Sequence, residues 1–148
     1  MMTTKINIAT EKFLSGYNWA QSVLYAFREE SDLPDETSLK IACGLGAGMA
    51  RKGEVCGAVT GGILVLGMLH GRGSKDDRSA TELTYLKTRI LMEEFAKKRG
   101  TYICRQLLNG CELTAEEGRK FFKENDMLNK VCVPCIQSVV EILGEIIK

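Results

Sequence analysis

The sequence predicts an all-α protein: a single-domain helical bundle over residues 1–148, with about five to seven helices and a glycine-rich central helix. Three observations predict this fold. Apolar residues recur at helical spacing, alternating strand patterns are scarce, and helix caps and stops fall between the apolar stretches. The length of 148 residues, with 45% hydrophobic and 26% charged residues, is typical of one globular domain. No repeat, low-complexity run or linker divides the chain.

The first part of the chain contains three predicted helices. A short one around residues 10–14 ends at Ser15-Gly16. Asn18 is a suitable N-cap for the next helix, and Leu33-Pro34 ends that segment. The third helix opens at Asp35 or its neighbour and carries an apolar face.

Glycine is concentrated between Gly44 and Gly62, on both sides of Cys56. A glycine inside a helix costs about 1 kcal/mol relative to alanine, so this density needs a reason. The usual reason is the close approach of another backbone or of a ligand. Gly57 and Gly61 are the candidates for contact with a cofactor. The apolar segment 63–69 follows directly and is predicted as the helix that Cys56 precedes.

The second half contains a long helix, a short one and two further ones. The long helix, over residues 79–99, stops at Gly100, and a short helix starts at Cys104. Thr114 and Glu117 predict a capping box for the next helix. The apolar stripe of the long helix consists of Leu83, Leu86, Ile90, Leu91 and Phe95. The last helix has its stripe at Leu128, Cys132, Cys135, Val139, Ile142 and Ile146.

Charge and hydropathy exclude two classes of partner. Twenty basic and nineteen acidic residues leave a net charge of +1, so the cationic excess that binds nucleic acid is missing. The most apolar window, residues 58–69, is shorter than the roughly 20 residues of a membrane span. Residues 1–10 lack the apolar core of a signal peptide. We therefore expect a cytoplasmic protein with no nucleic-acid partner and no stable membrane insertion.

The six cysteines are the main candidates for function. In a reducing cytosol, clustered cysteines are more often metal ligands or transient redox thiols than structural disulfides. Cys56, Cys104 and Cys132 are each predicted at a helix start, where free N–H groups and the helix dipole favour the thiolate. Pro134 suits a first helical turn and puts Cys135 one turn after Cys132. Core packing is the alternative for each of them, because free cysteine is often buried.

The remaining candidates carry less chemistry. Cys43, near the end of a helix, is expected in the core, and Cys111, after a glycine turn, is expected to be exposed and incidental. His70 is the only histidine and is expected to be a capping or surface residue. A metal would therefore be held chiefly by thiolates, which favour an iron–sulfur cluster or zinc.

Several motifs together resemble one known family. We interpret Cys56-Gly57-Ala58-Val59-Thr60-Gly61 as its Cys-Gly-Ala-x-x-Gly signature. Further similar segments are Gly16-Tyr17-Asn18 with Ala20-Gln21, the glycine run 44–48, Cys104-Arg105-Gln106-Leu107-Leu108, and Cys132 with Glu141-Ile142-Leu143. The chain thus resembles the C_GCAxxG_C_C family, small prokaryotic proteins for which a redox role is inferred from their cysteines.

The resemblance implies four characteristic cysteines. Cys56, Cys104 and Cys132 match three of them, whereas Trp19 stands where the family has the first. Cys135, one helical turn from Cys132, is the candidate replacement for the missing sulfur, and Cys43 is a less suitable one.

Two functions remain open from the sequence. The first is a redox site of the four thiolates Cys56, Cys104, Cys132 and Cys135, making the protein an oxidoreductase or an electron-transfer protein with an unidentified redox partner. The thiolates would either hold an iron–sulfur cluster or zinc, or exchange reversibly with disulfides. The alternative is a non-catalytic helical interaction or dimerisation module, such as a homodimer, with structural core cysteines. An enzyme using a glycine-lined pocket has little support, since no acid–base pair is present.

Overall fold

The computed structural model describes residues 2–148, and this part of the chain is all-α, as predicted. Within it, β-type pairing is confined to a single bridge between Val55 and Ile103. The helices are α1 (Met2–Leu14), α2 (Trp19–Ala26), α3 (Asp35–Ala42), α4 (Gly46–Met49), α5 (Gly57–His70), α6 (Arg78–Arg99), α7 (Cys104–Leu107), α8 (Glu116–Glu124) and α9 (Val133–Ile146). A 3₁₀ turn, Cys43–Leu45, precedes α4, and a π-helical turn, Leu128–Cys132, precedes α9.

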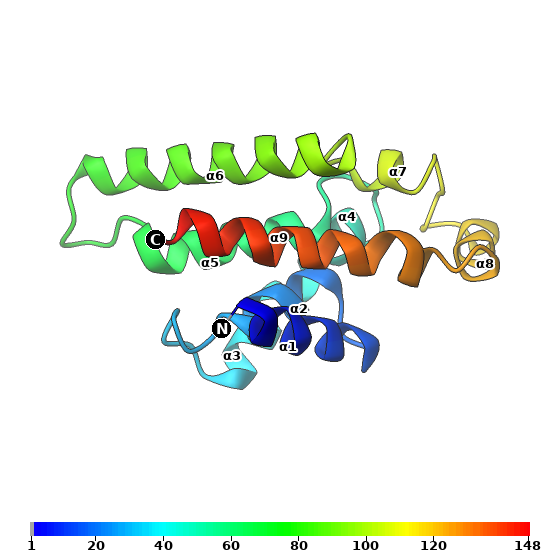
Figure 1. The fold of residues 1–148 in the computed structure, drawn as a ribbon, viewed down its shortest axis with the longest axis horizontal. Coiled ribbons are helices and arrows are strands. Elements are labelled where there is room, and N and C mark those ends of the chain that lie inside the picture. Colours follow the sequence, from blue (N-terminus) through cyan, green and yellow to red (C-terminus); the bar gives the residue numbers. More distant parts are fainter. Residues whose placement is uncertain (1) are drawn as a thin grey trace.

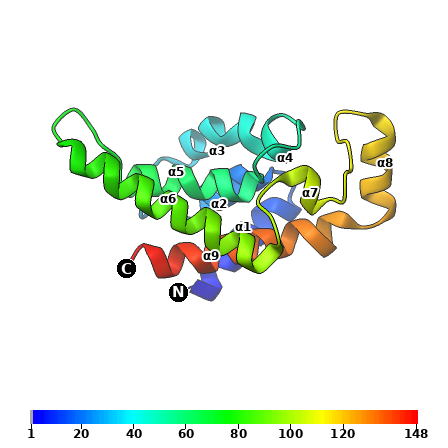
Figure 2. The same ribbon diagram turned by 90° about the horizontal axis from the view of Figure 1, so that it is seen from above.

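The helices stack in three layers (Figure 1). α6 forms one outer layer, α5 and α9 form the middle one, and α1, α2 and α3 form the other outer layer. α5 contacts α2, α6 and α9, and α1 contacts both α2 and α9. Seen from above, α8 stands at one end of the molecule, near α7 (Figure 2). Within residues 2–148 no single helix is long and apolar enough to cross a membrane.

The core lies along the middle layer. α5 buries Val59, Val65 and Leu66 completely, and α9 buries Val139 and Leu143. These side chains recur at helical spacing, so one face of each helix meets the other layers. The glycine-rich helix is thus apolar on nearly all sides and packs between its neighbours.

α6 buries less of its predicted stripe than expected. Leu91 and Phe95 are fully buried, but Leu83, Leu86 and Ile90 are 41%, 48% and 36% exposed. α6 is an outer helix of 22 residues, and its main packing partners are α5 and α9. Its apolar stripe is therefore longer than the surface that covers it.

Local signals located some helix ends correctly, but α2 ends at Ala26 with Phe27 as its C-cap, before the predicted stop at Leu33-Pro34. Asn18 caps α2 in a capping box: its Oδ1 accepts from the Gln21 N–H at 2.9 Å, and its own N–H donates to Gln21 Oε1 at 3.0 Å. α1 begins at Met2, well before the predicted residue 10, and ends before Gly16, which has φ 111°. The capping box predicted at Thr114 is wrong, because α8 begins at Glu116 after Ala115, which makes no side-chain cap.

An unpredicted left-handed turn, Ala47 to Arg51, overlaps the short α4 and leads to the segment before Cys56. All residues from Ala47 to Arg51 have positive φ, at 56°, 67°, 67°, 53° and 68°. Only Gly48 among them adopts this conformation without steric cost. A Cβ at Gly48 would lie 2.6 Å from the Glu54 backbone nitrogen. The Glu54 N–H donates to the Gly48 carbonyl at 3.0 Å, so the turn is tied to the chain that leads into Cys56.

Gly61 sets the distance between α5 and α2. A Cβ at this position would lie 2.7 Å from the Ala20 carbonyl oxygen, which is closer than a real Cβ can come. The two helices therefore approach at backbone contact. Close backbone approach, one of the two reasons predicted for the glycine density, is confirmed at Gly61; its contact with a cofactor stays a prediction.

Candidate thiol site

Cys56 and Cys104 are brought together by a short pairing of two extended segments. The Cys56 N–H donates to the Tyr102 carbonyl at 2.8 Å, and the Cys104 N–H donates to the Glu54 carbonyl at 2.6 Å. The Val55–Ile103 bridge lies between these two bonds. Cys56 is then the N-cap of α5 and Cys104 the first residue of α7, as the sequence predicts. Two helices therefore begin side by side, each with a cysteine at its start.

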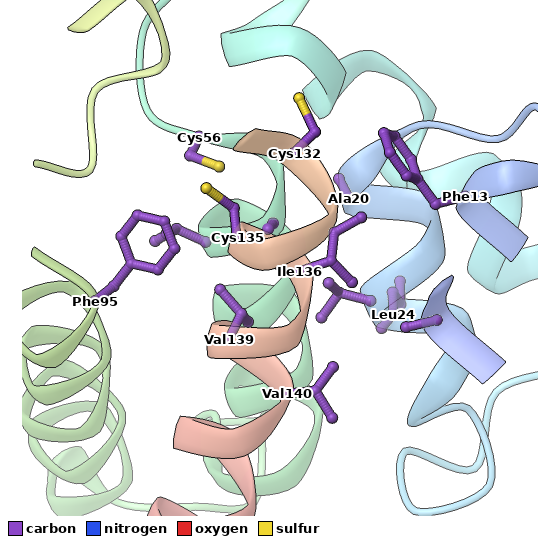
Figure 3. Packing of buried hydrophobic residues seen from close by; sticks show 14 of the residues in the cluster. Phe13, Ala20, Leu24, Cys56, Phe95, Cys132, Cys135, Ile136, Val139 and Val140 are labelled. Carbon is purple, nitrogen blue, oxygen red and sulfur yellow. The ribbon is translucent and has the colours of Figure 1, made fainter. Parts of the chain in front are cut away.

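Cys132 and Cys135 come from the start of α9, in a continuous helical segment. Cys132 has right-handed helical angles, and the Val133 N–H donates to the Leu128 carbonyl across the π-helical turn. Cys132 lies immediately before α9, as predicted, but this helix start is not free, because the preceding turn already uses the Val133 N–H group. Figure 3 shows the Cys135 and Cys56 sulfurs pointing toward one another, whereas the Cys132 sulfur points away from this pair.

Cys56 is the thiol whose ionisation the site favours. The side chain of Cys135 donates a hydrogen bond to the Cys56 sulfur and lowers its pKa from the ordinary value. Burial opposes this effect, and the N–H groups of Ala58 and Val59 at the start of α5 lower the pKa further. Cys56 is only 4% exposed, although the residues that follow it are small and shield it little by themselves. The next residue, Gly57, packs directly against α2 and the 3₁₀ turn, so this side of the α5 start is covered.

Cys135 is the complementary member of the pair. Its pKa is raised, first because its thiol proton is held in the hydrogen bond to Cys56 and then by burial. The positive charge of Arg99, at the end of α6, opposes this rise. Arg99 is held in place by its Nε, which donates to Ser138 Oγ at 3.0 Å. Arg99 and Ser138 lie far apart in the chain and match no motif, so no sequence signal predicts their place beside Cys135.

Cys104 and Cys132 complete the cluster but are held as thiols. Burial, together with the charge on Cys56, raises the pKa of each to about 12. The expectation that a helix start favours the thiolate is therefore wrong for these two, because burial outweighs the dipole. Their mutual influence indicates that all four predicted cysteines lie near one another. Within residues 2–148 no group of three or more His, Cys, Asp or Glu is arranged to hold a metal ion.

The comparison with protein families agrees with this grouping of cysteines. The family model described as "Putative redox-active protein (C_GCAxxG_C_C)" matches residues 17–146. The chain belongs to the C_GCAxxG_C_C family. In the pattern of the family's name, glycine precedes the second cysteine and alanine follows it, whereas this chain has Val55 before Cys56 and Gly57-Ala58 after it. Comparison with curated proteins and with solved structures finds no match.

Trp19, which we aligned with the first cysteine of the C_GCAxxG_C_C pattern, lies in the cluster itself. It is the first residue of α2, and its side chain hydrogen-bonds Cys132 and lowers the pKa of that thiol against the effect of burial. A Cβ at Gly57 would lie 2.9 Å from the Trp19 Cβ, so residue 19 also contacts the start of α5. A cysteine at position 19 would therefore begin its side chain beside the start of α5, next to Cys56 in the chain.

The other two cysteines are placed opposite to expectation. Cys43, expected in the core, is exposed in the 3₁₀ turn after α3. Cys111, expected in an exposed turn, is buried, and its thiol donates to the Gly118 carbonyl of α8 at 3.0 Å. The reason is tertiary: α8 folds back over the segment before it. His70 ends α5, as predicted, with burial and the charge of Lys87 lowering its pKa.

Proposed function

We propose that this member of the C_GCAxxG_C_C family is a dithiol redox protein in which Cys56 and Cys135 form a reversible disulfide. The observation that carries the proposal is geometric: the Cys56 and Cys135 sulfurs, from the start of α5 and from α9, point toward one another (Figure 3). Their contact lowers the pKa of Cys56 and raises that of Cys135. A lowered pKa makes Cys56 the nucleophile, since the thiolate is the reactive form. Cys135 is the resolving thiol, held against it.

The reaction is an exchange with a disulfide, written RSSR. The Cys56 thiolate attacks one sulfur of RSSR, forming a mixed disulfide and releasing RS⁻. RS⁻ takes the proton of Cys135 and leaves as RSH. The Cys135 thiolate then attacks the Cys56 sulfur, closes the internal disulfide and releases a second RS⁻, which is protonated by water. Two electrons pass from the cysteine pair to RSSR.

Two features of the site support this division of roles. Arg99 favours the Cys135 thiolate, which forms only in the second step. Both sulfurs are deeply buried, so a small disulfide reaches them more readily than a folded protein does. A disulfide also needs only two sulfurs, whereas a metal cluster needs three or four around one point.

The proposal predicts one specific linkage. Treat the reduced protein with 2-hydroxyethyl disulfide, block the remaining thiols with N-ethylmaleimide in denaturant, and map the peptides by mass spectrometry. We expect a Cys56–Cys135 disulfide that dithiothreitol reverses, with the other cysteines alkylated. Cys43→Ser should form the same linkage, because Cys43 is exposed and outside the cluster.

Three results would contradict the dithiol proposal. A linkage from Cys56 to Cys104 or Cys132 would assign the resolving role elsewhere. Stoichiometric iron or zinc in protein purified without oxygen, lost in Cys56→Ser, would favour the metal site proposed for Cys56, Cys104, Cys132 and Cys135. Six free thiols after treatment would favour the structural module.

A further inference from the structure

A cavity that the proposed thiol chemistry does not use lies beside the cluster. It has a volume of about 430 Å³, within the range of small-molecule sites, and is formed by α2, the left-handed turn, α8 and the π-helical turn. Its apolar surface comes from Trp19, Leu113, Phe122 and Leu128. Two of these side chains are aromatic, so the cavity has surfaces on which a flat ring can pack.

The charged side chains around the cavity are mostly positive. The cavity is lined by the three cations Arg51, Arg119 and Lys123. Its one carboxylate is that of Asp126, so the local charge is three minus one, or +2. The whole chain carries only +1, so positive charge is concentrated here. The Asp126 carboxylate already accepts a hydrogen bond from Asn129 Nδ2 at 2.9 Å. The guanidinium of Arg119 is fixed by its donation to the Leu113 carbonyl at 2.9 Å.

The left-handed turn contributes to both the apolar and the positively charged surface of the cavity. Its first residue, Ala47, is buried in the cavity wall, and its last, Arg51, lies at the charged side. Both have positive φ, which costs free energy for a residue with a side chain. Such strained backbone is concentrated at binding sites, because packing must hold it there.

We propose that this cavity binds a small aromatic molecule carrying an anionic group. The ring lies against Trp19 and Phe122, and the anion lies among Arg51, Arg119 and Lys123. The proposal does not depend on the disulfide chemistry of Cys56. Because Trp19 also hydrogen-bonds Cys132, the bound molecule would lie one side chain away from the thiol cluster.

The test uses 8-anilinonaphthalene-1-sulfonate, an aromatic sulfonate whose fluorescence rises on binding. Trp19 is the only tryptophan and lines the cavity, so a probe bound there quenches its emission by energy transfer, and the cavity variants decide whether the probe lies at this site. Titrating the reduced full-length protein should quench Trp19 and saturate at one probe per chain. N-phenyl-1-naphthylamine, which lacks the sulfonate, should bind about tenfold more weakly.

Two double variants distinguish binding in the cavity from a general effect of surface charge. Arg51→Gln with Lys123→Gln removes two cavity cations and should raise the probe Kd about tenfold or more. Lys52→Gln with Lys120→Gln removes the same charge from neighbouring exposed residues that do not line the cavity, and should leave the Kd unchanged. Equal affinity for the charged and neutral probes, binding without quenching of Trp19, or an equal loss in both double variants would overturn the proposal. The probe comparison needs no variant to fold.

Discussion

The pKa of Cys56 depends on a balance between burial and hydrogen bonding. Burial alone raises the pKa of a thiol, as it does at Cys104 and Cys132. At Cys56 the hydrogen bond from Cys135 and two backbone N–H groups reverse that direction. The difference is one of partners, since all of these side chains are buried.

Removing the Cys135 thiol should therefore raise the pKa of Cys56. In Cys135→Ala we expect the rate of Cys56 alkylation by iodoacetamide, followed by peptide mass spectrometry, to shift to higher pH by about 1–2 units. Cys132→Ala, one helical turn away, is the matched control and should shift the profile far less, since Cys132 does not hydrogen-bond Cys56. Equal shifts in both variants would remove the special role of Cys135.

The sequence predicted where these cysteines lie along the helices but not how they ionise. The glycine run followed by an apolar segment is a local signal, and it correctly placed Cys56 before α5. Burial and the Cys135 hydrogen bond arise from contacts between α5 and α9, which are distant in the chain. The thiolate predicted at Cys104 was wrong because burial, another tertiary property, raises the pKa of that thiol.

At the scale of elements, the glycines of α5 perform different tasks. Gly61 meets the backbone of α2, whereas Gly67 is exposed and has open space where a Cβ would lie. Only the first is needed for packing. The second merely weakens the helix, because glycine has a lower helix propensity than alanine.

This contrast gives opposite effects for one substitution. Gly61→Ala should lower the free energy of unfolding by about 1–3 kcal/mol, since α2 and α5 must move apart. Gly67→Ala should raise it by about 1 kcal/mol. Urea unfolding followed by circular dichroism measures both. A stabilising Gly61→Ala would show that the helices do not meet at this residue.

Other elements differ in how far they could be predicted. The ends of α1 and α6 follow from Gly16 and Gly100, whose positive φ is a local property of glycine. The left-handed turn from Ala47 to Arg51 carries no such signal, since four of its residues normally avoid positive φ. Its conformation is held by hydrogen bonds to the segment before Cys56 and could not be inferred from composition.

At the scale of the whole molecule, the buried thiols make the free energy of unfolding depend on pH in the alkaline range. In the unfolded chain Cys104 and Cys132 ionise near the ordinary value of 9.0, whereas burial raises their pKa to about 12 in the fold. Between these values the unfolded state has lost protons that the folded state keeps. Stability is therefore complete below pH 9 and falls as the pH rises toward 12.

The double variant Cys104→Ser with Cys132→Ser should lose less stability as the pH rises, by up to a few kcal/mol at the highest pH. Urea midpoints measured from pH 8 to about pH 11 in the presence of a reductant would show it. Cys43→Ser is the matched control, because its side chain is exposed in both states. An identical pH dependence in the double variant and the wild type would assign the alkaline loss to other groups.

The pairing of the segments around Val55 and Ile103 has a consequence for how the protein is made. Cys56 and Cys104 meet across 48 residues of chain, and Cys135 joins them only when the last helix docks. During synthesis the earlier thiols are complete while their partner is still missing. An oxidant that acts at this stage would link the earlier cysteines to one another, because Cys135 is not yet in place. On the proposed Cys56–Cys135 chemistry, oxidation is therefore productive only after α9 has docked.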